Sequence, residues 1–411
     1  MPFANSANLY LYCITIWINT AKNHLCRCLL TNWIGLCLIL LLLPTSGCAP
    51  PHAPLGDYQI RYHADLAERW LVNNLNKSNL FNYAYYANQD RYSSNNNAIR
   101  QLMSSRVLAS MVQTKKAYLP DHERNLSHLM AAWYREEGDL AYVWFKNQSK
   151  LGANALLLRT LVASPFFDLY TDQANKLARG ILSLASPEGE LRAFYRTSRS
   201  DYDEERLLKF YSGEALLALL EYATAVDDQN WIREAQRIQE FYLQQYVTNI
   251  RENYYPAYVP WHTLSLHQLF LITNDVRYPK AVFILTDRLL TMMDTDLFPG
   301  RFYNDATPEF GSPHAASDGV YTEGLLYALE LAHLAGDERR VQRYRAAARL
   351  ALENLYSLQF QRHNIAGFSQ PERALGGIRS RHNSSSIRID SVQHTLDALH
   401  KAIQLQEQLL L

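Results

Sequence analysis

The chain has 411 residues, 48% of them hydrophobic, and its 40 basic residues balance 40 acidic ones. This near neutrality, with no run of basic residues, argues against nucleic acid as a partner. Every cysteine lies near the N-terminus, and these residues are Cys13, Cys26, Cys28, Cys37 and Cys48. Residues beyond position 48 can therefore form no disulfide and no cysteine-ligated zinc site, so burial of apolar surface must stabilise the fold.

The first 47 residues are arranged as a signal peptide of the lipoprotein type. Lys22 and Arg27 precede an apolar run at 33–43, which is shorter than the roughly 20 residues that cross a bilayer. The run ends at Thr45-Ser46-Gly47-Cys48, which resembles a bacterial lipobox. We therefore expect cleavage before Cys48 and acylation of its thiol, with plain secretion as the alternative.

Residues 48–57 contain three prolines and predict a tether between the lipid and the folded domain. This arrangement predicts a lipid-anchored protein of the bacterial cell envelope that faces the periplasm. The outer membrane is the preferred location, because Ala49 stands where an aspartate would resemble an inner-membrane retention signal. Nothing in the sequence predicts an oligomeric state.

Helical patterns of two kinds alternate through the rest of the chain. The charged, amphipathic helices are predicted at 58–76, 121–136, 168–186, 229–246, 276–294 and 338–361. The nearly apolar helices are predicted at 97–114, 150–164, 211–226, 261–273, 319–335 and 388–407. The alternation gives six helical hairpins, and a period of roughly 50–70 residues is the signature of a repeat architecture.

Apolar inner helices inside charged outer helices predict a closed ring, because an open stack would leave two apolar ends uncovered. We therefore expect an all-α, (α/α)6 toroid over residues 58–411. A short aromatic segment precedes each inner helix, at 81–85, 141–145, 191–195, 254–258, 300–303 and 366–368. These segments should gather at one end of the ring, where they either form a mouth that stacks sugars or only plug the opening.

This architecture, with Tyr211-Ser212-Gly213-Glu214-Ala215-Leu216 and Thr322-Glu323-Gly324-Leu325-Leu326, resembles the six-hairpin superfamily of carbohydrate-active enzymes. That superfamily includes glycoside hydrolases, sugar epimerases and polysaccharide lyases. The resemblance covers about residues 55–408 and implies a carbohydrate partner, but it matches no single family's catalytic motif.

Polar residues at the starts of the inner helices should converge in one concavity. The candidates for catalysis are Glu214, Glu323, Asp390, His262, Tyr211 and Tyr321. The candidates for substrate binding are Asn97, Arg100, Trp261, Arg388, His394 and Tyr258. Ordinary structural roles stay open for these residues: Asn97, Asn154 and Asp318 suit helix caps, and the glutamates suit the first turn of a helix.

Three functions fit these residues. Glycoside hydrolysis needs one protonated and one ionised carboxyl, and Glu214 and Glu323 facing each other across the ring suit an inverting reaction. A uronate lyase or epimerase would instead use tyrosine or histidine with an arginine on the carboxylate. A non-catalytic, glycan-binding protein of envelope assembly is the third possibility. Phosphate-loop, Rossmann and HExxH motifs are absent, so we expect no cofactor and no metal.

Two loops are also candidates. The acidic residues 200–205 predict a solvated loop, because they lack the glycine and spacing of a calcium-binding EF-hand. The long loop 371–386 carries a glycine pair and three arginines, which would suit a lid over an anionic group.

Overall fold

The computed structural model describes residues 56–198, 203–408 and 410–411. The predicted signal peptide, the lipidation site Cys48 and most of the tether lie outside this part of the chain, as do residues 200–202 of the acidic loop. Among the described residues, we find no helix with the length and apolar character needed to cross a membrane.

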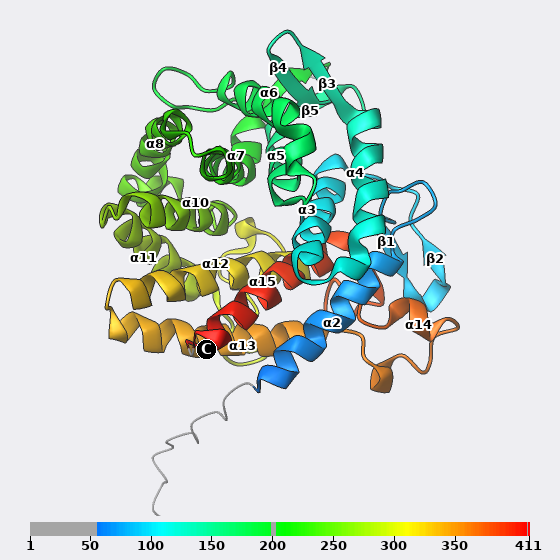
Figure 1. Ribbon diagram of the computed structural model, residues 1–411. Coiled ribbons are helices and arrows are strands. Elements are labelled where there is room, and N and C mark those ends of the chain that lie inside the picture. The colour runs from blue at the N-terminus through cyan, green and yellow to red at the C-terminus, as the bar shows by residue number, and fades with distance from the viewer. Residues whose placement is uncertain (1–55, 199–202, 409) are drawn as a thin grey trace, which may run out of the picture. The chain divides into compact units, whose positions relative to one another are not determined.

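The predicted all-α toroid is confirmed, with its twelve main helices in the predicted order (Figure 1). The outer helices are α2 (Asp57–Asn73), α4 (Leu119–Trp133), α6 (Thr171–Leu182), α8 (Gln229–Leu243), α11 (Arg277–Leu289) and α13 (Glu338–Leu358). The inner helices are α3 (Ala98–Thr114), α5 (Leu151–Ala163), α7 (Glu204–Val226), α10 (Tyr258–Thr273), α12 (Ala315–Leu334) and α15 (Ile389–Glu407). Two short helices, α9 (Ile250–Asn253) and α14 (Pro371–Ala374), lie in connections.

The inner helices form a closed ring. Each contacts the next in chain order, and α15 contacts α3, so the last hairpin meets the first. Close approach is possible because glycines lie at the contacts: a Cβ on Gly213 of α7 would lie 2.7 Å from the backbone nitrogen of His262 on α10. A Cβ on Gly319 of α12 would lie 2.8 Å from the carbonyl carbon of His394 on α15. The ring is thus packed too tightly at these points to admit even a methyl group.

Strands are short and confined to the segments between helices. β1 (Ala84–Tyr86) pairs with β2 (Arg91–Tyr92) and with β7 (Ser386–Arg388), which links the first and last hairpins. β3 (Tyr134–Glu137) pairs with β4 (Leu140–Val143), and β5 (Gln148–Lys150) pairs with β6 (Phe194–Thr197).

Three inner helices begin at least three residues earlier than their apolar patterns predict, and one of them is α10, which begins at Tyr258 rather than at 261. α7 begins at Glu204 rather than at 211, with Asp203 as its cap, and α12 begins at Ala315 rather than at 319, with His314 as its cap. The first three residues of α7 are charged, so the apolar pattern misses them. Glu214 and Glu323 consequently lie well inside their helices, and the interpretation of them as first-turn acids is wrong.

Polar side chains early in the inner helices hold the aromatic segments in place. Asn154 accepts a hydrogen bond from the backbone of Val143 at 2.8 Å, and Asp318 accepts one from Phe302 at 2.9 Å. Asn154 and Asp318 therefore hold the backbone of the preceding aromatic segment by hydrogen bonds, and they are not the helix caps that the sequence predicted. Asn97 does cap its helix, because its side chain accepts from the backbone nitrogen of Arg100.

Candidate active site

A cavity of about 370 Å³ opens where α3, α7, α10, α12 and α15 begin. Nine of the twelve candidate site residues line it, namely Asn97, Arg100, Tyr211, Glu214, Trp261, Tyr321, Arg388, Asp390 and His394. The predicted order of the inner helices in the toroid was therefore enough to place most of the candidates at one cavity. His314 and Gln393 also line the cavity, and the sequence analysis did not select them.

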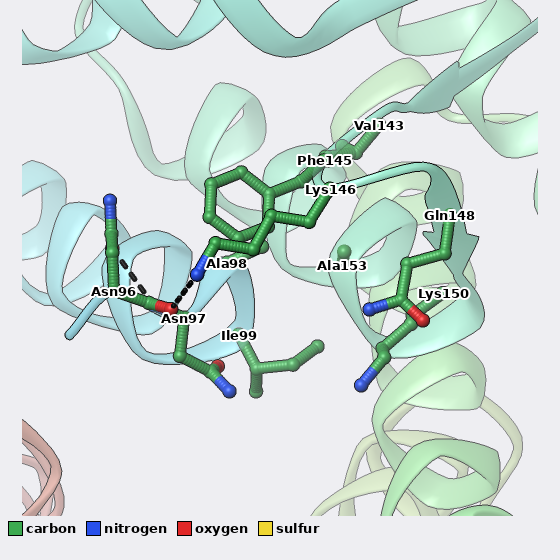
Figure 2. Close-up of a pocket in the computed structure, with 10 residues that line it drawn as sticks. All are labelled: Asn96, Asn97, Ala98, Ile99, Val143, Phe145, Lys146, Gln148, Lys150 and Ala153. Atoms are coloured by element: carbon green, nitrogen blue, oxygen red, sulfur yellow. Dashed lines mark hydrogen bonds between the residues drawn. The ribbon is translucent and has the colours of Figure 1, made fainter. Parts of the chain in front are cut away.

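A second, smaller cavity of about 100 Å³ adjoins the first and shares Asn97 and Ile99 with it (Figure 2). It lies between the start of α3 and the start of α5. Among the described residues, α5 is the only inner helix that contributes none to the lining of the main cavity. We call it the side chamber, and its lining is Asn96, Asn97, Ala98, Ile99, Val143, Phe145, Lys146, Gln148, Lys150 and Ala153.

Glu214 is 3% exposed, and its Oε1 atom has no hydrogen-bond partner among the described residues. Arg159 approaches Oε1 only to 3.9 Å, because its guanidinium makes two 2.9 Å hydrogen bonds to Glu221. Burial raises the pKa of Glu214 to about 8, so its carboxyl is protonated at neutral pH. The main cavity therefore has a carboxylic acid in its wall that can donate a proton.

Asp390 lines the same cavity in the opposite protonation state. Its two oxygens accept hydrogen bonds from Arg100 at 2.7 Å and from Arg388 at 2.6 Å. Burial alone would raise the pKa of Asp390, but the two guanidinium groups hold it below its ordinary value. Asp390 is therefore ionised, and two positive charges surround one negative charge at this side of the cavity.

Two neutral histidines complete the polar lining. Burial lowers the pKa of His394 to about 4, and its Nδ1 atom is buried with no hydrogen-bond partner in the described chain. Burial likewise lowers the pKa of His314 to about 4, and its Nδ1 accepts from the backbone of Ala316 as the cap of α12. His394 is thus an uncharged group that could accept a proton from a ligand.

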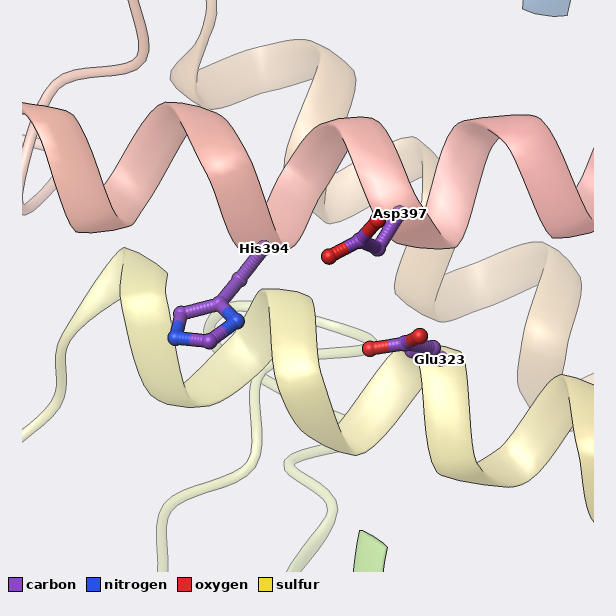
Figure 3. Close-up of side chains that lie close together, drawn as sticks. All are labelled: Glu323, His394 and Asp397. Atoms are coloured by element: carbon purple, nitrogen blue, oxygen red, sulfur yellow. The ribbon is translucent and has the colours of Figure 1, made fainter. Parts of the chain in front are cut away.

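Glu323 is not among the residues that line the main cavity. It lies on the side of α12 that faces α15, next to His394 and Asp397 (Figure 3). Burial and the charge of Asp397 raise its pKa, so Glu323 is protonated at neutral pH. It therefore does not face Glu214 across an open cavity as the sequence analysis expected.

Glu323, His394 and Asp397 are also the only described residues whose grouping could hold a metal ion, since their ligand atoms lie within 4.8 Å of one another. Arg106, however, forms an ion pair with Asp397, and its charge opposes the approach of a cation. Among the described residues, this group is better suited to sharing a proton than to binding a metal.

His262 and Tyr258 lie behind the cavity wall. The His262 ring bonds Ser212 at 3.0 Å, and burial lowers its pKa to about 3. Tyr258 is fully buried and stacks on Tyr246 with ring centroids 3.9 Å apart. Both residues support α10 from within the core, away from the cavity lining.

Aromatic rings do line the main cavity, but they come from helices: Phe210, Tyr211, Trp261 and Tyr321. The predicted aromatic segments mostly pack together, as Tyr142 and Tyr195 do with centroids 4.7 Å apart. Phe145 is an exception, because it lines the side chamber. For most of these rings, packing against other rings fits the prediction that they plug the opening better than the prediction that they form a mouth that stacks sugars.

The loop 371–386 does not cover the main cavity with its arginines. Arg373 pairs with Asp90 at 2.7 Å, and Arg379 lies over the ring of Phe360 at 4.4 Å. Arg381 lines an outer groove of about 580 Å³, which shares His314 and Arg388 with the main cavity.

The fold and cavity define a class: an (α/α)6 toroid with a polar cavity where the inner helices begin. No family model and no curated protein matches the sequence. Solved structures match it over nearly their whole length. A heparin-specific unsaturated glucuronyl hydrolase has a TM-score of 0.60 at 10% identity, with 86% of this chain and 99% of that chain covered.

A D-mannose isomerase has a TM-score of 0.63 at 11% identity, with 85% of this chain and 98% of that one covered. An α-mannanase of glycoside hydrolase family 76 from Bacteroides thetaiotaomicron has a TM-score of 0.61 at 10% identity, with coverage of 86% and 98%. The chain therefore has the fold of the six-hairpin carbohydrate-active enzymes, as its sequence resemblance implied. These likenesses in themselves establish the fold and leave the reaction open.

Proposed function

We propose that this protein hydrolyses glycosidic bonds, with Glu214 as the general acid and Asp390 as the general base. The observation that supports this assignment is the opposite protonation of two carboxyl groups in one cavity. Burial keeps Glu214 protonated, whereas Arg100 and Arg388 keep Asp390 ionised. Environments that move two pKa values apart provide the acid and the base that glycoside hydrolysis requires.

In the proposed reaction, Glu214 donates its proton to the glycosidic oxygen as the bond from that oxygen to the anomeric carbon breaks. A water molecule attacks the anomeric carbon from the opposite face and gives a proton to Asp390, whose oxygens each keep a lone pair beyond the arginine contact. The product has inverted configuration. Exchange of protons with solvent then restores both carboxyl groups.

The substrate class that best fits the cavity is a glycan with an anionic sugar. Arg100 and Arg388 place two positive charges against the single negative charge of Asp390, and their side chains are 24% and 28% exposed. The excess positive charge suits a uronate carboxylate, which guanidinium groups recognise well. The glucuronyl hydrolase among the structural neighbours is consistent with this choice.

A sugar isomerase or epimerase is the second candidate, and the neutral His394 favours it. Its imidazole lines the cavity uncharged at neutral pH, as a base that removes a proton from a sugar carbon must be. The D-mannose isomerase among the structural neighbours is consistent with this reaction. A binder without catalytic activity is the third candidate.

Product analysis with a panel of neutral and uronate-containing glycans separates these candidates. Hydrolysis adds one water per bond broken and creates a new reducing end. Isomerisation leaves the mass unchanged, and elimination produces an unsaturated uronate. We expect hydrolysis, with uronate-containing members cleaved fastest. Unchanged mass in the products of an active enzyme would favour His394 chemistry, and binding without any product would favour the non-catalytic candidate.

We also propose that the protein is anchored in the envelope through an acylated Cys48, with the outer membrane preferred. The lipobox-like residues before Cys48 and the proline-rich segment after it support this proposal. In a bacterial host, labelled palmitate should be incorporated into the wild-type chain and not into Cys48→Ser. Normal processing and membrane retention of that variant would contradict lipidation.

A further inference from the structure

We propose that the side chamber is a second binding subsite, which takes an anionic substituent on the sugar next to the one in the main cavity. The inference rests on the proposed glycan-binding function of the main cavity. It adds a location, a ligand charge and the residues that select it. A sulfate ester and a carboxylate share the required chemistry.

The first support is position. The side chamber and the main cavity share Asn97 and Ile99, so a ligand that fills one lies next to the other. The amide oxygen of Asn97 caps α3, and its amide nitrogen makes no hydrogen bond within the described part of the chain. That nitrogen is therefore a donor at the point where the two spaces meet.

The second support is charge. Lys146 and Lys150 both line the side chamber, and none of the described residues in its lining is acidic. The Lys146 amino group donates to the backbone oxygen of Asn96 at 3.2 Å and lies 5.4 Å from the centre of the Phe145 ring (Figure 2). No carboxylate among the described residues forms an ion pair with Lys146, whose amino group lines the chamber.

The third support is the backbone that presents Lys146. Lys146 and Asn147 both have positive φ, at 49° and 59°, in the two-residue turn between Phe145 and Gln148. Positive φ is uncommon for a residue with a long side chain and costs free energy, so it persists only where the surroundings impose it. The turn is closed by a 3.0 Å hydrogen bond from the Phe145 nitrogen to the Gln148 oxygen, and it fixes Lys146 beside the chamber.

Size decides which part of a ligand enters. The chamber volume of about 100 Å³ is well below the roughly 300–1,000 Å³ of pockets that enclose a whole small ligand. A charged substituent therefore fits better than a complete sugar ring. The Phe145 ring next to the lysine can contact the apolar face of the sugar that carries it.

A glycan array with neutral, carboxylated and sulfated forms of the same oligosaccharides tests the subsite. The proteins compared are Glu214→Gln, which prevents turnover, and Glu214→Gln with Lys146→Met and Lys150→Met added. The matched control adds Lys280→Met instead, since Lys280 is exposed on the outer helix α11. We expect anionic forms to bind about tenfold or more tightly than neutral forms, because a charge-assisted hydrogen bond is worth roughly 1.5–3 kcal/mol.

The lysine variants should lose that preference while still binding neutral forms, and the Lys280 control should keep it. A preference for the sulfated or for the carboxylated form then identifies the substituent. Equal binding of neutral and anionic forms, an unchanged preference in the lysine variants, or no glycan binding at all would overturn the proposal. Binding does not depend on turnover, so a wild-type protein that shows the preference and cleaves none of the glycans would refute hydrolysis and leave the subsite intact.

Discussion

At the residue scale, Glu214 differs from Asp390, the other acid among the described residues that line the main cavity. The nearest ion-pair partner of Glu214 is 3.9 Å away, whereas Asp390 has two arginine partners within 2.7 Å. Its neighbours α5 and α10 touch the same stretch of α7: a Cβ at Gly152 would lie 2.4 Å from the Tyr211 ring. The apolar run that follows Glu214 predicted an enclosed helix, and that enclosure is the cause of the raised pKa.

The first prediction concerns stability and pH. Burial raises the pKa of Glu214 from the ordinary 4.5 to about 8, so the folded protein keeps a proton that the unfolded chain releases. The stability contributed by that proton is complete below the unfolded pKa and is lost as pH rises to about 8. Glu214→Gln has no such proton, so its free energy of unfolding should improve relative to wild type over this range, by a few kcal/mol.

Urea unfolding of wild type and Glu214→Gln at a series of pH values between about 5 and 8 measures this difference. The exposed acid Glu338, at the start of α13, provides the control: Glu338→Gln should follow wild type throughout. A Glu214→Gln difference that does not change with pH would mean that Glu214 is already ionised in the folded protein.

At the element scale, the apolar pattern predicted the helices and their order but not all of their starts. The first three residues of α7 are charged, and charged residues carry no periodic apolar signal. The hydrogen bonds from Asn154 and Asp318 to the aromatic segments could not be predicted either. Asn154 looks like a cap in the sequence, and only the fold shows that its partner is the backbone of Val143.

The second prediction concerns the contact between α12 and α15. Replacing glycine by alanine inside a helix usually stabilises it by up to about 1 kcal/mol. At Gly319 the new Cβ would lie 2.8 Å from the backbone of His394, and overpacking of this kind typically costs about 1–3 kcal/mol. Gly319→Ala should therefore lower the melting temperature and reduce activity by moving His394.

Gly367→Ala is the matched control, because nothing lies within 4 Å of the Cβ it would add. Thermal unfolding of both variants should separate them, with Gly367→Ala close to wild type. A Gly319→Ala protein as stable and as active as wild type would show that α12 and α15 do not approach as closely as the structure places them.

At the scale of the whole molecule, closure of the ring creates the candidate site. Arg100 on α3 and Asp390 on α15 are 290 residues apart and meet because the first and last inner helices touch. The toroid predicted from the sequence already places these two helices in contact, and it therefore predicts where most of the cavity lies. No sequence pattern specifies which arginine meets which carboxylate, and the pairing of Asp390 with two arginines became visible only in the folded chain.

The same limit applies to Glu323. Its position at an inner helix suggested the second carboxyl of a catalytic pair, whereas its side chain lies next to His394 and Asp397 and is not among the residues that line the cavity. The direction of one side chain depends on the rotation of its helix about the helix axis, and packing against the neighbouring helices sets that rotation.

The central proposal is proton donation by Glu214 to a leaving sugar, and the dependence of rate on the leaving group tests it most directly. The measurement compares wild type, Glu214→Gln and the control Glu338→Gln on a natural glycan and on a dinitrophenyl glycoside of the same sugar. A natural sugar leaving group needs protonation, so Glu214→Gln should lose roughly 10²–10⁴-fold in kcat/KM on the glycan. A dinitrophenolate leaves without protonation, so the same variant should retain most of its activity on that substrate, and Glu338→Gln should match wild type on both. Equal losses on the two substrates, or full activity of Glu214→Gln on the glycan, would contradict the assignment of Glu214 as the general acid.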